Sequence, residues 1–154
     1  MKSIIKSLYQ YSKNEKRIKT FLNAFDVNCK IRAIEASNPN ILIVILEYLS
    51  NDKEYYVRYK VAGNKSSPIH ILDKLSKDEN KDIRCCVAIN HNTPIHILEK
   101  LSNDEDSGVR ASVARNPNIP DYILEKLSDD ESQIVRYCVS KNLRNKYSHF
   151  RKDE

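Results

Sequence analysis

The apolar residues of this chain recur at helical spacing in short blocks. In the segment 94–102 one stripe is apolar at relative positions 0, 3, 4 and 7, as a helix against a core requires: Pro94, Ile97, Leu98 and Leu101. Thr93 is a good N-cap residue, and Pro94 after it favours the first helical position. Asp104 then predicts the start of a second helix that ends at Asn116. The buried stripe of this second helix is Val109, Val113 and Ala114.

The polar residues show that these blocks are copies with a period of 26 residues. Three polar series recur without a gap: Asp26, Asp52, Asp78, Asp104 and Asp130; Arg32, Arg58, Arg84, Arg110 and Arg136; Asn38, Asn64, Asn90, Asn116 and Asn142. A helix pair of this size does not bury its own apolar face, so consecutive pairs must stack. The sequence therefore predicts an all-α solenoid of five helix-pair repeats, each of about 26 residues.

The repeats are expected to fill residues 13–142, with a half-repeat before them. The first repeat has the same apolar spacing as the others, two residues later: Ile18, Phe21, Leu22 and Phe25. Residues 1–12 are predicted to form an N-terminal capping half-repeat, and residues 143–154 a basic C-terminal tail. The segment 41–49 is apolar on additional faces, so we expect the N-terminal helices to cover it; the alternative is an exposed apolar patch.

The segments 109–118 and 123–127 resemble the leucine-rich-repeat variant family. The resemblance extends over roughly residues 13–142 and implies a right-handed α solenoid, an armadillo- or HEAT-like superhelix. It also implies, in general terms, a role in binding macromolecules. The founding member of the family holds an iron–sulfur cluster through clustered cysteines ahead of its repeats. This chain lacks such a cysteine cluster, so no cofactor is expected.

Other chemistry has little support in the sequence. The cysteines lack chelate spacing, which predicts no metal site: Cys29, Cys85, Cys86 and Cys138. The longest apolar run, residues 41–46, is too short to span a bilayer and the N-terminus lacks a signal-peptide pattern, so we expect a cytoplasmic protein with reduced thiols. His70 and His96 share one repeat position, but two ligands make a poor zinc site. There is no signature of a catalytic triad, a phosphate loop or a zinc protease, so the protein is not expected to be an enzyme.

The arginine and asparagine series are interpreted as structural. Arg110 falls at the edge of the core, where a charge needs a partner, and Asp104 precedes it by six residues in a pattern that every repeat keeps. We therefore expect an Asp–Arg ladder along the solenoid; the alternative is an arginine row that binds phosphate. The asparagine side chains are expected to hold the backbone amides of the turns.

The candidate binding surface lies on the second helix of each repeat. Residues two, three and six positions after its leading valine or isoleucine point away from the core, and many of them are small, aromatic or apolar. They predict a partner-binding row with tyrosine anchors: Tyr59, Lys60, Cys85, Cys86, Ile89, Ala111, Arg115, Tyr137, Cys138 and Lys141. The alternative is that a curved stack crowds these positions, so that small residues only relieve packing.

Charge favours a protein partner over a nucleic acid. Residues 1–25 carry a net charge of +5, residues 26–142 one of −2, and residues 143–154 one of +2. A solenoid that binds nucleic acid is expected to line its groove with unpaired lysines and arginines. The sequence thus predicts a scaffold for a protein or peptide partner. The alternatives are a nucleic-acid binder that uses the basic N-terminal cap and the array ends, and a structural or homo-oligomeric unit.

Overall fold

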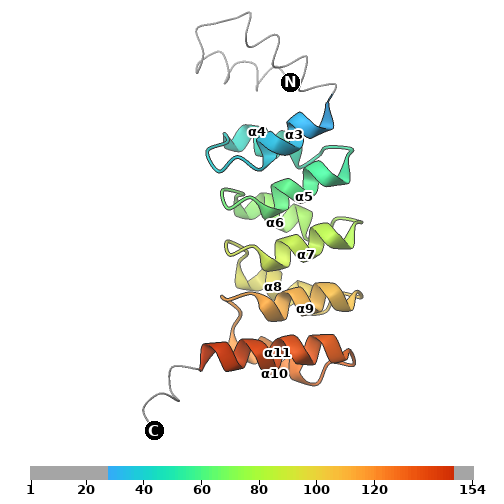
Figure 1. Cartoon of the computed structure of the whole chain (residues 1–154), viewed down its shortest axis with the longest axis vertical. Helices are drawn as coiled ribbons and strands as arrows, with labels where there is room; N and C mark the ends of the chain where they lie inside the picture. Colours follow the sequence, from blue (N-terminus) through green and yellow to red (C-terminus); the bar gives the residue numbers. More distant parts are fainter. Residues whose placement is uncertain (1–27, 148–154) are drawn as a thin grey trace, which may run out of the picture.

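The computed structural model describes residues 28–147, and all regular structure in this part of the chain is α-helical. Its elements in chain order are α3 (Cys29–Ala36), α4 (Ile43–Leu49), α5 (Tyr55–Gly63), α6 (Ile69–Leu75), α7 (Lys81–Ile89), α8 (Ile95–Leu101), α9 (Ser107–Arg115), α10 (Asp121–Ser128) and α11 (Gln133–Lys146). They stack one above another into an elongated array (Figure 1). The predicted α solenoid is confirmed.

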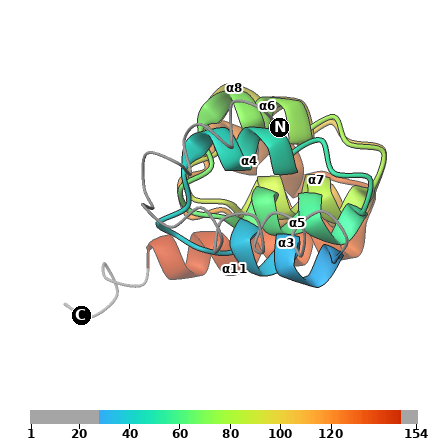
Figure 2. The same cartoon turned by 90° about the horizontal axis from the view of Figure 1, so that it is seen from above.

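The helices form two layers, one from each half of the repeat. Seen along the stack, α4, α6 and α8 lie in one layer, and α3, α5, α7 and α11 lie in the other (Figure 2). Each second helix, from α3 to α11, packs directly on the next second helix. Each first helix packs instead on the second helices before and after it in sequence. The second-helix layer is therefore the closely packed side of the solenoid.

The core lies between the two layers and is filled by the apolar stripes that the sequence repeats. The fully buried side chains are contributed at corresponding positions of successive repeats: Leu46, Leu72, Leu98 and Leu124; Leu49, Leu75, Leu101 and Leu127; Val57, Ile83, Val109 and Val135. Burying one such side chain stabilises a fold by about 1.5–3 kcal/mol. The four later repeats supply the same set, so the core continues from α4 to α11 without a break.

The helix starts differ from the sequence prediction by one or two residues. Pro94 is the N-cap of α8 rather than its first residue, and the Thr93 hydroxyl donates to the carbonyl of Val87 in the previous helix. Asp106, not Asp104, caps α9 by accepting the Gly108 amide at 2.8 Å. The Asp104 carboxylate lies in the loop before the helix, where it accepts the Asp106 amide. The loop before each of α5, α7, α9 and α11 is therefore an aspartate turn, in which the aspartate carboxylate accepts the amide two residues later.

The ends of α5, α7 and α9 follow the asparagine series, whereas α3 is capped by Ser37, one residue before Asn38. Asn64, Asn90 and Asn116 are the C-caps of α5, α7 and α9. In contrast, α11 continues past Asn142 to Lys146. The Lys146 ammonium and the Tyr147 hydroxyl, at its end, both bond to the Asp121 carboxylate of α10. The extra turn is thus tied back to the preceding helix, and the regular repeat register stops in α11.

Several predictions fall on segments that the structure leaves undescribed. The capping half-repeat 1–12, the first helix of the first repeat and most of the tail 143–154 lie outside residues 28–147. The expected covering of segment 41–49 by the N-terminal helices also depends on those residues. Between Asn28 and Tyr147, no helix combines the length and apolarity needed to cross a bilayer.

Candidate binding groove and the ladders that support it

The arginines from Arg32 to Arg110 are each held by the repeat that follows them. Arg84 on α7 donates from Nε to Asp104 Oδ2 at 2.8 Å and from Nη2 to Asp104 Oδ1 at 2.9 Å. The same two-pronged pairing, twenty residues forward, joins Arg32 to Asp52, Arg58 to Asp78 and Arg110 to Asp130. A planar guanidinium matches a carboxylate in this geometry, so each pair fixes the register between two repeats.

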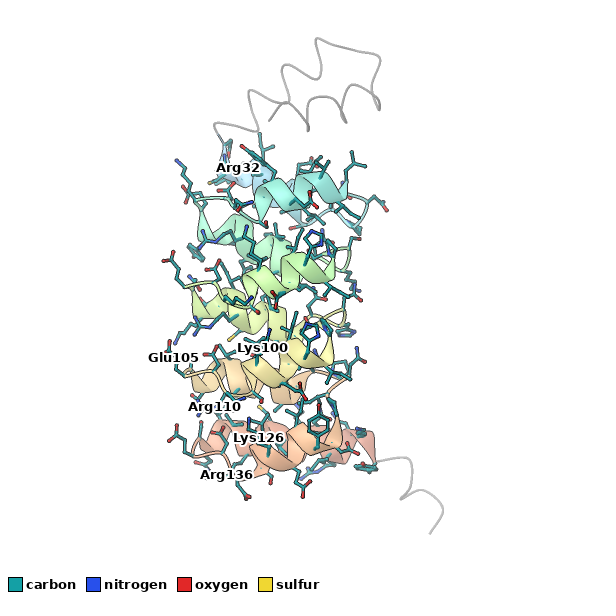
Figure 3. The ribbon with its side chains drawn as sticks, turned by 180° about the vertical axis from the view of Figure 1, so that it is seen from behind. Arg32, Lys100, Glu105, Arg110, Lys126 and Arg136 are labelled. Atoms are coloured by element: carbon teal, nitrogen blue, oxygen red, sulfur yellow. The ribbon has the colours of Figure 1, made fainter. Side chains whose placement is uncertain are left out.

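The sequence prediction paired each arginine with the aspartate six residues before it, and this carboxylate pairing is wrong. That residue contributes its main chain instead: Arg84 Nη1 donates to the carbonyl of Asp78 at 3.0 Å. Its own carboxylate faces the previous repeat, because the aspartate turn points the side chain backwards along the stack. Figure 3 shows Arg32, Arg110 and Arg136 on one edge of the stack, which is where these pairs follow each other.

The arginine–aspartate pairing shifts the pKa of both partners. The hydrogen bond from Arg110 holds the pKa of Asp130 below its usual range, although partial burial opposes the shift. The hydrogen bond to Asp104 raises the pKa of Arg84, again against the effect of burial. Both partners are therefore charged, and their side chains are about one-tenth exposed. Since the guanidinium groups of these rungs are engaged inside the protein, they are poorly placed to bind phosphate.

The asparagines form a second ladder, next to the core. Asn90 Nδ2 donates to the carbonyls of Ala62 and Asn64 in the previous repeat, at 2.8 and 3.0 Å. Its Oδ1 accepts the amide of Asn92 in its own turn, as the sequence led us to expect. Asn64, Asn116 and Asn142 donate in the same way to the repeat before them. The bonds between repeats were not anticipated.

The predicted partner-binding row is exposed in some repeats and buried in others. Tyr59, Ile89 and Tyr137 are exposed, and Lys60, Cys85 and Cys86 are half-buried. Ala111 and Cys138, each 2% exposed, were wrongly expected on the surface. They are covered because neighbouring second helices pack directly on one another. Crowding therefore explains the small residues of α9, whereas α5 and α7 leave an open surface.

That open surface is a groove between α5 and α7 with a volume of about 700 Å³. Its walls are mainly tyrosine, cysteine and isoleucine, with few charges: Tyr55, Tyr56, Tyr59, Gly63, Lys65, Asp82, Cys85, Cys86, Ile89, Asn90 and His91. A second hollow, of about 420 Å³, lies farther along the same layer, where Arg115, Cys138 and Lys141 meet the end of α11. We call the first hollow the tyrosine groove.

The aromatic wall of the tyrosine groove is preorganised. The rings of Tyr56 and Tyr59 lie parallel within 7°, with centroids 6.5 Å apart. The Lys60 ammonium sits 5.0 Å from the Tyr56 centroid and 5.9 Å from that of Tyr59, a cation–π arrangement that holds the two rings together. Both tyrosines keep a third or more of their surface exposed. They therefore present flat ring faces to a ligand.

The thiol at the floor of the groove has low reactivity. Burial raises the pKa of the Cys86 thiol to about 11, so this cysteine is almost wholly protonated at neutral pH and is a poor nucleophile. Its Sγ lies 3.1 Å from the position that a Cβ on Gly63 would occupy. Gly63 thus lets the two helices approach closely, and the pair forms a smooth apolar floor.

The sequence prediction missed five residues of the groove: Tyr55, Tyr56, Lys65, Asp82 and His91. It selected only positions that follow the leading valine of the helix. Tyr56 precedes Val57, but it stands three residues before Tyr59, and residues with this spacing share a helix face. The i, i+3 rule was therefore a usable signal for the aromatic pair. No comparable signal marks the loop residues Lys65 and His91.

The histidines of the outer layer do not form a site. His70 Nε2 lies 3.2 Å from Glu47 Oε1, and at the corresponding position of a later repeat the Tyr122 hydroxyl bonds to Glu99. These are contacts between exposed side chains of successive first helices. Among residues 28–147, no three histidine, cysteine or carboxylate side chains are grouped to hold a metal ion.

The comparisons with known proteins concern the repeat. The family model described as leucine rich repeat variant matches residues 108–132, which comprise most of α9 and all of α10. A solved structure titled "a leucine-rich repeat variant with a novel repetitive protein structural motif" aligns with 90% of this chain and 71% of its own, at 17% identity and a TM-score of 0.41. No curated protein matches the chain. The match to the family model confirms the resemblance to the leucine-rich repeat variant family, in a repeat whose Asp, Arg and Asn pattern the other described repeats share.

Proposed function

We propose that this protein is a non-enzymatic scaffold that binds an extended segment of a protein or peptide partner along its second-helix layer. The observation that carries the proposal is the tyrosine groove, in which exposed aromatic rings stand over an apolar floor. Tyrosine is enriched among residues that dominate binding energy, because it buries a large area at low entropic cost. All four cysteines are free, which agrees with a cytoplasmic setting.

The groove suits an extended chain because it lies on a continuous helix layer. The partner's apolar side chains would contact Tyr56, Tyr59 and Ile89. Polar groups at the rim, among them Lys65 and His91, would orient its backbone and polar side chains. The second hollow at Arg115 and Lys141 lies farther along this layer, so a longer segment would reach both.

The charges of the array support a protein partner over nucleic acid. The ladder arginines from Arg32 to Arg110 are paired with aspartates. On the outer layer, Lys74 and Lys126 bond to Ser50 and Ser102, the C-caps of the preceding first helices. These cations are therefore engaged within the protein and do not form an open row for phosphates.

The experiment is a selection of random peptides displayed on phage against the whole chain, followed by fluorescence anisotropy with the enriched peptide. Tyr59→Ala and Ile89→Glu are each expected to weaken binding at least tenfold, because both remove apolar contact area in the groove. Tyr122→Ala is the matched control, since this tyrosine is 53% exposed but lies on the outer layer. The proposal fails if no peptide is enriched, or if the outer-layer change weakens binding as much as the groove changes do.

A further inference from the structure

The tyrosine groove carries opposite charges at its two ends. It runs between α5 and α7, whose last turns are joined by the hydrogen bond from Asn90 Nδ2 to the carbonyl of Asn64, so the two helices end on the same side. Asp82, in the first turn of α7, lines one end of the groove. Lys65 and His91, which directly follow the C-caps of the two helices, line the other end.

These charged side chains are available to a ligand. All three are exposed. Within residues 28–147, the Asp82 carboxylate, the Lys65 ammonium and the His91 ring have no hydrogen-bond or ion-pair partner. The neighbouring charges of Lys81 and Asp106, in contrast, pair with each other at 2.9 Å. The groove therefore offers a carboxylate at one end and a cation at the other.

The charges are a local feature of this groove and not a part of the repeat. A residue that serves the fold recurs in every repeat, as the ladder arginines and asparagines do. At the repeat position of Asp82, the other described repeats have Lys30, Tyr56, Gly108 and Ile134. At the position that Lys65 and His91 share, the repeats on either side have Pro39 and Pro117.

The acidic end suits a basic side chain of the partner. Tyr55 and Tyr56, in the first turn of α5, line the groove at the same end as Asp82 and are 53% and 48% exposed. The Lys60 ammonium above the Tyr56 ring lines an adjoining hollow toward Ser37, the C-cap of α3, and not this groove. An arginine guanidinium binds a carboxylate through two hydrogen bonds and stacks on aromatic rings.

The distance between the two ends sets the length of the ligand. From residue 82 to residue 91 the chain rises by 1.5 Å per residue of helix, which gives roughly 13 Å. Four steps of an extended chain, at about 3.3 Å each, cover the same distance. Alternate residues of an extended chain share one face, so the middle residue of five faces the apolar floor at Gly63 and Cys86.

We propose that the tyrosine groove binds an extended partner segment with a basic residue, an apolar residue and an acidic residue at its first, third and fifth positions. The basic side chain enters beside Asp82 and the tyrosines, and the acidic one meets Lys65 and His91. Charge complementarity identifies this occupant, because the groove holds one unpaired carboxylate and two unpaired basic side chains at opposite ends. The inference rests on the function proposed above and names the chemistry of its partner.

The test is a nitrogen–proton NMR titration of the whole protein with the acetylated and amidated pentapeptide Arg-Ser-Leu-Ser-Glu. The backbone amides of Asp82 and His91 are expected to shift together and saturate. The isomer Arg-Glu-Ser-Leu-Ser has the same composition, but its charges are too close to reach both ends, so it should bind about threefold more weakly. Gln-Ser-Leu-Ser-Gln, which lacks both charges, should bind about tenfold more weakly.

A charge reversal decides whether Asp82 receives the basic residue. Asp82→Lys is expected to weaken Arg-Ser-Leu-Ser-Glu and to strengthen Glu-Ser-Leu-Ser-Glu, so that the preference between the two peptides is inverted. A carboxylate that served only the helix would not produce this inversion. Glu125→Lys is the matched control, because it makes the same change of charge at an exposed residue of α10, outside the groove, and should leave both affinities unchanged.

Three outcomes would overturn the inference. Equal affinities for the charged and neutral peptides would do so and leave the groove as a binding site, because apolar contacts would then be sufficient. Failure of every one of these peptides to bind would do so as well, while the phage selection would still decide the proposed function. If the Asp82 and His91 amides shift with protein concentration alone, a second copy of the chain fills the groove instead.

Discussion

Arg84 of α7 holds the carboxylate of Asp104, twenty residues later, through two hydrogen bonds of 2.8 and 2.9 Å, while its third nitrogen bonds to the backbone of its own repeat. One side chain thereby joins the loop of one repeat to the loop of the next. Both partners are about nine-tenths buried, so the pair lies where water competes weakly. This relationship makes the loop edge of the solenoid a line of cross-links between repeats.

We expect Arg84→Ala to destabilise the protein much more than Arg136→Ala. The first change leaves the Asp104 carboxylate buried without its cation, and losing one partner of a charged hydrogen bond costs about 1–3 kcal/mol. The second removes an arginine that no described carboxylate contacts. Urea unfolding followed by circular dichroism measures the difference. Equal losses in the two variants would show that the pairing between repeats contributes little.

Stability is expected to fall in acid because of the ladder. Hydrogen bonding from Arg110 lowers the pKa of Asp130 in the folded state. Its contribution is therefore complete above the unfolded-state pKa of about 3.9 and is lost as the pH falls through the lower folded-state value. The free energy of unfolding should decrease from about pH 5 to about pH 2. Asp130→Asn should be less stable at neutral pH and show a shallower decrease.

Asn90→Asp is expected to be among the most disruptive near-isosteric changes. It places a carboxylate oxygen where Nδ2 now donates to the carbonyls of Ala62 and Asn64, so two acceptors face an acceptor. We expect a loss of about 2–3 kcal/mol at neutral pH, partly recovered when acid protonates the new carboxyl. Thermal and urea unfolding measure it. Asn103→Asp is the control and should change stability little, because this exposed side chain donates only to the Glu99 carbonyl and accepts from the Lys126 ammonium, which a carboxylate also binds.

The cysteines should differ widely in reactivity. With its pKa raised to about 11, Cys86 has very little thiolate at neutral pH, whereas Cys29 is exposed. Iodoacetamide is expected to label Cys86 about 100-fold more slowly than Cys29, as mass spectrometry of tryptic peptides would measure. In denaturing urea the two rates should converge. Rapid labelling of Cys86 in the folded protein would contradict the closed, apolar floor of the tyrosine groove.

The sequence by itself determined the repeat, the helix pairs and the core. Leu72, Leu98 and Leu124 are buried where the 26-residue period places them, because an apolar stripe at helical spacing has one favourable face in any stack of such pairs. The end of α9 at Asn116 also followed from local preference. These features depend on residues close together in sequence, and periodicity is enough to find them.

Only the tertiary structure decided how one repeat meets the next. Arg84 has two aspartates within reach, Asp78 and Asp104, and the stacking distance of the second helices selects the carboxylate of the later one. The same stacking buries Ala111 yet leaves Tyr59 open, although both hold one repeat position. Such choices depend on the volumes of side chains from neighbouring helices, which a pattern of polar and apolar residues does not encode. The tyrosine groove arises at this level.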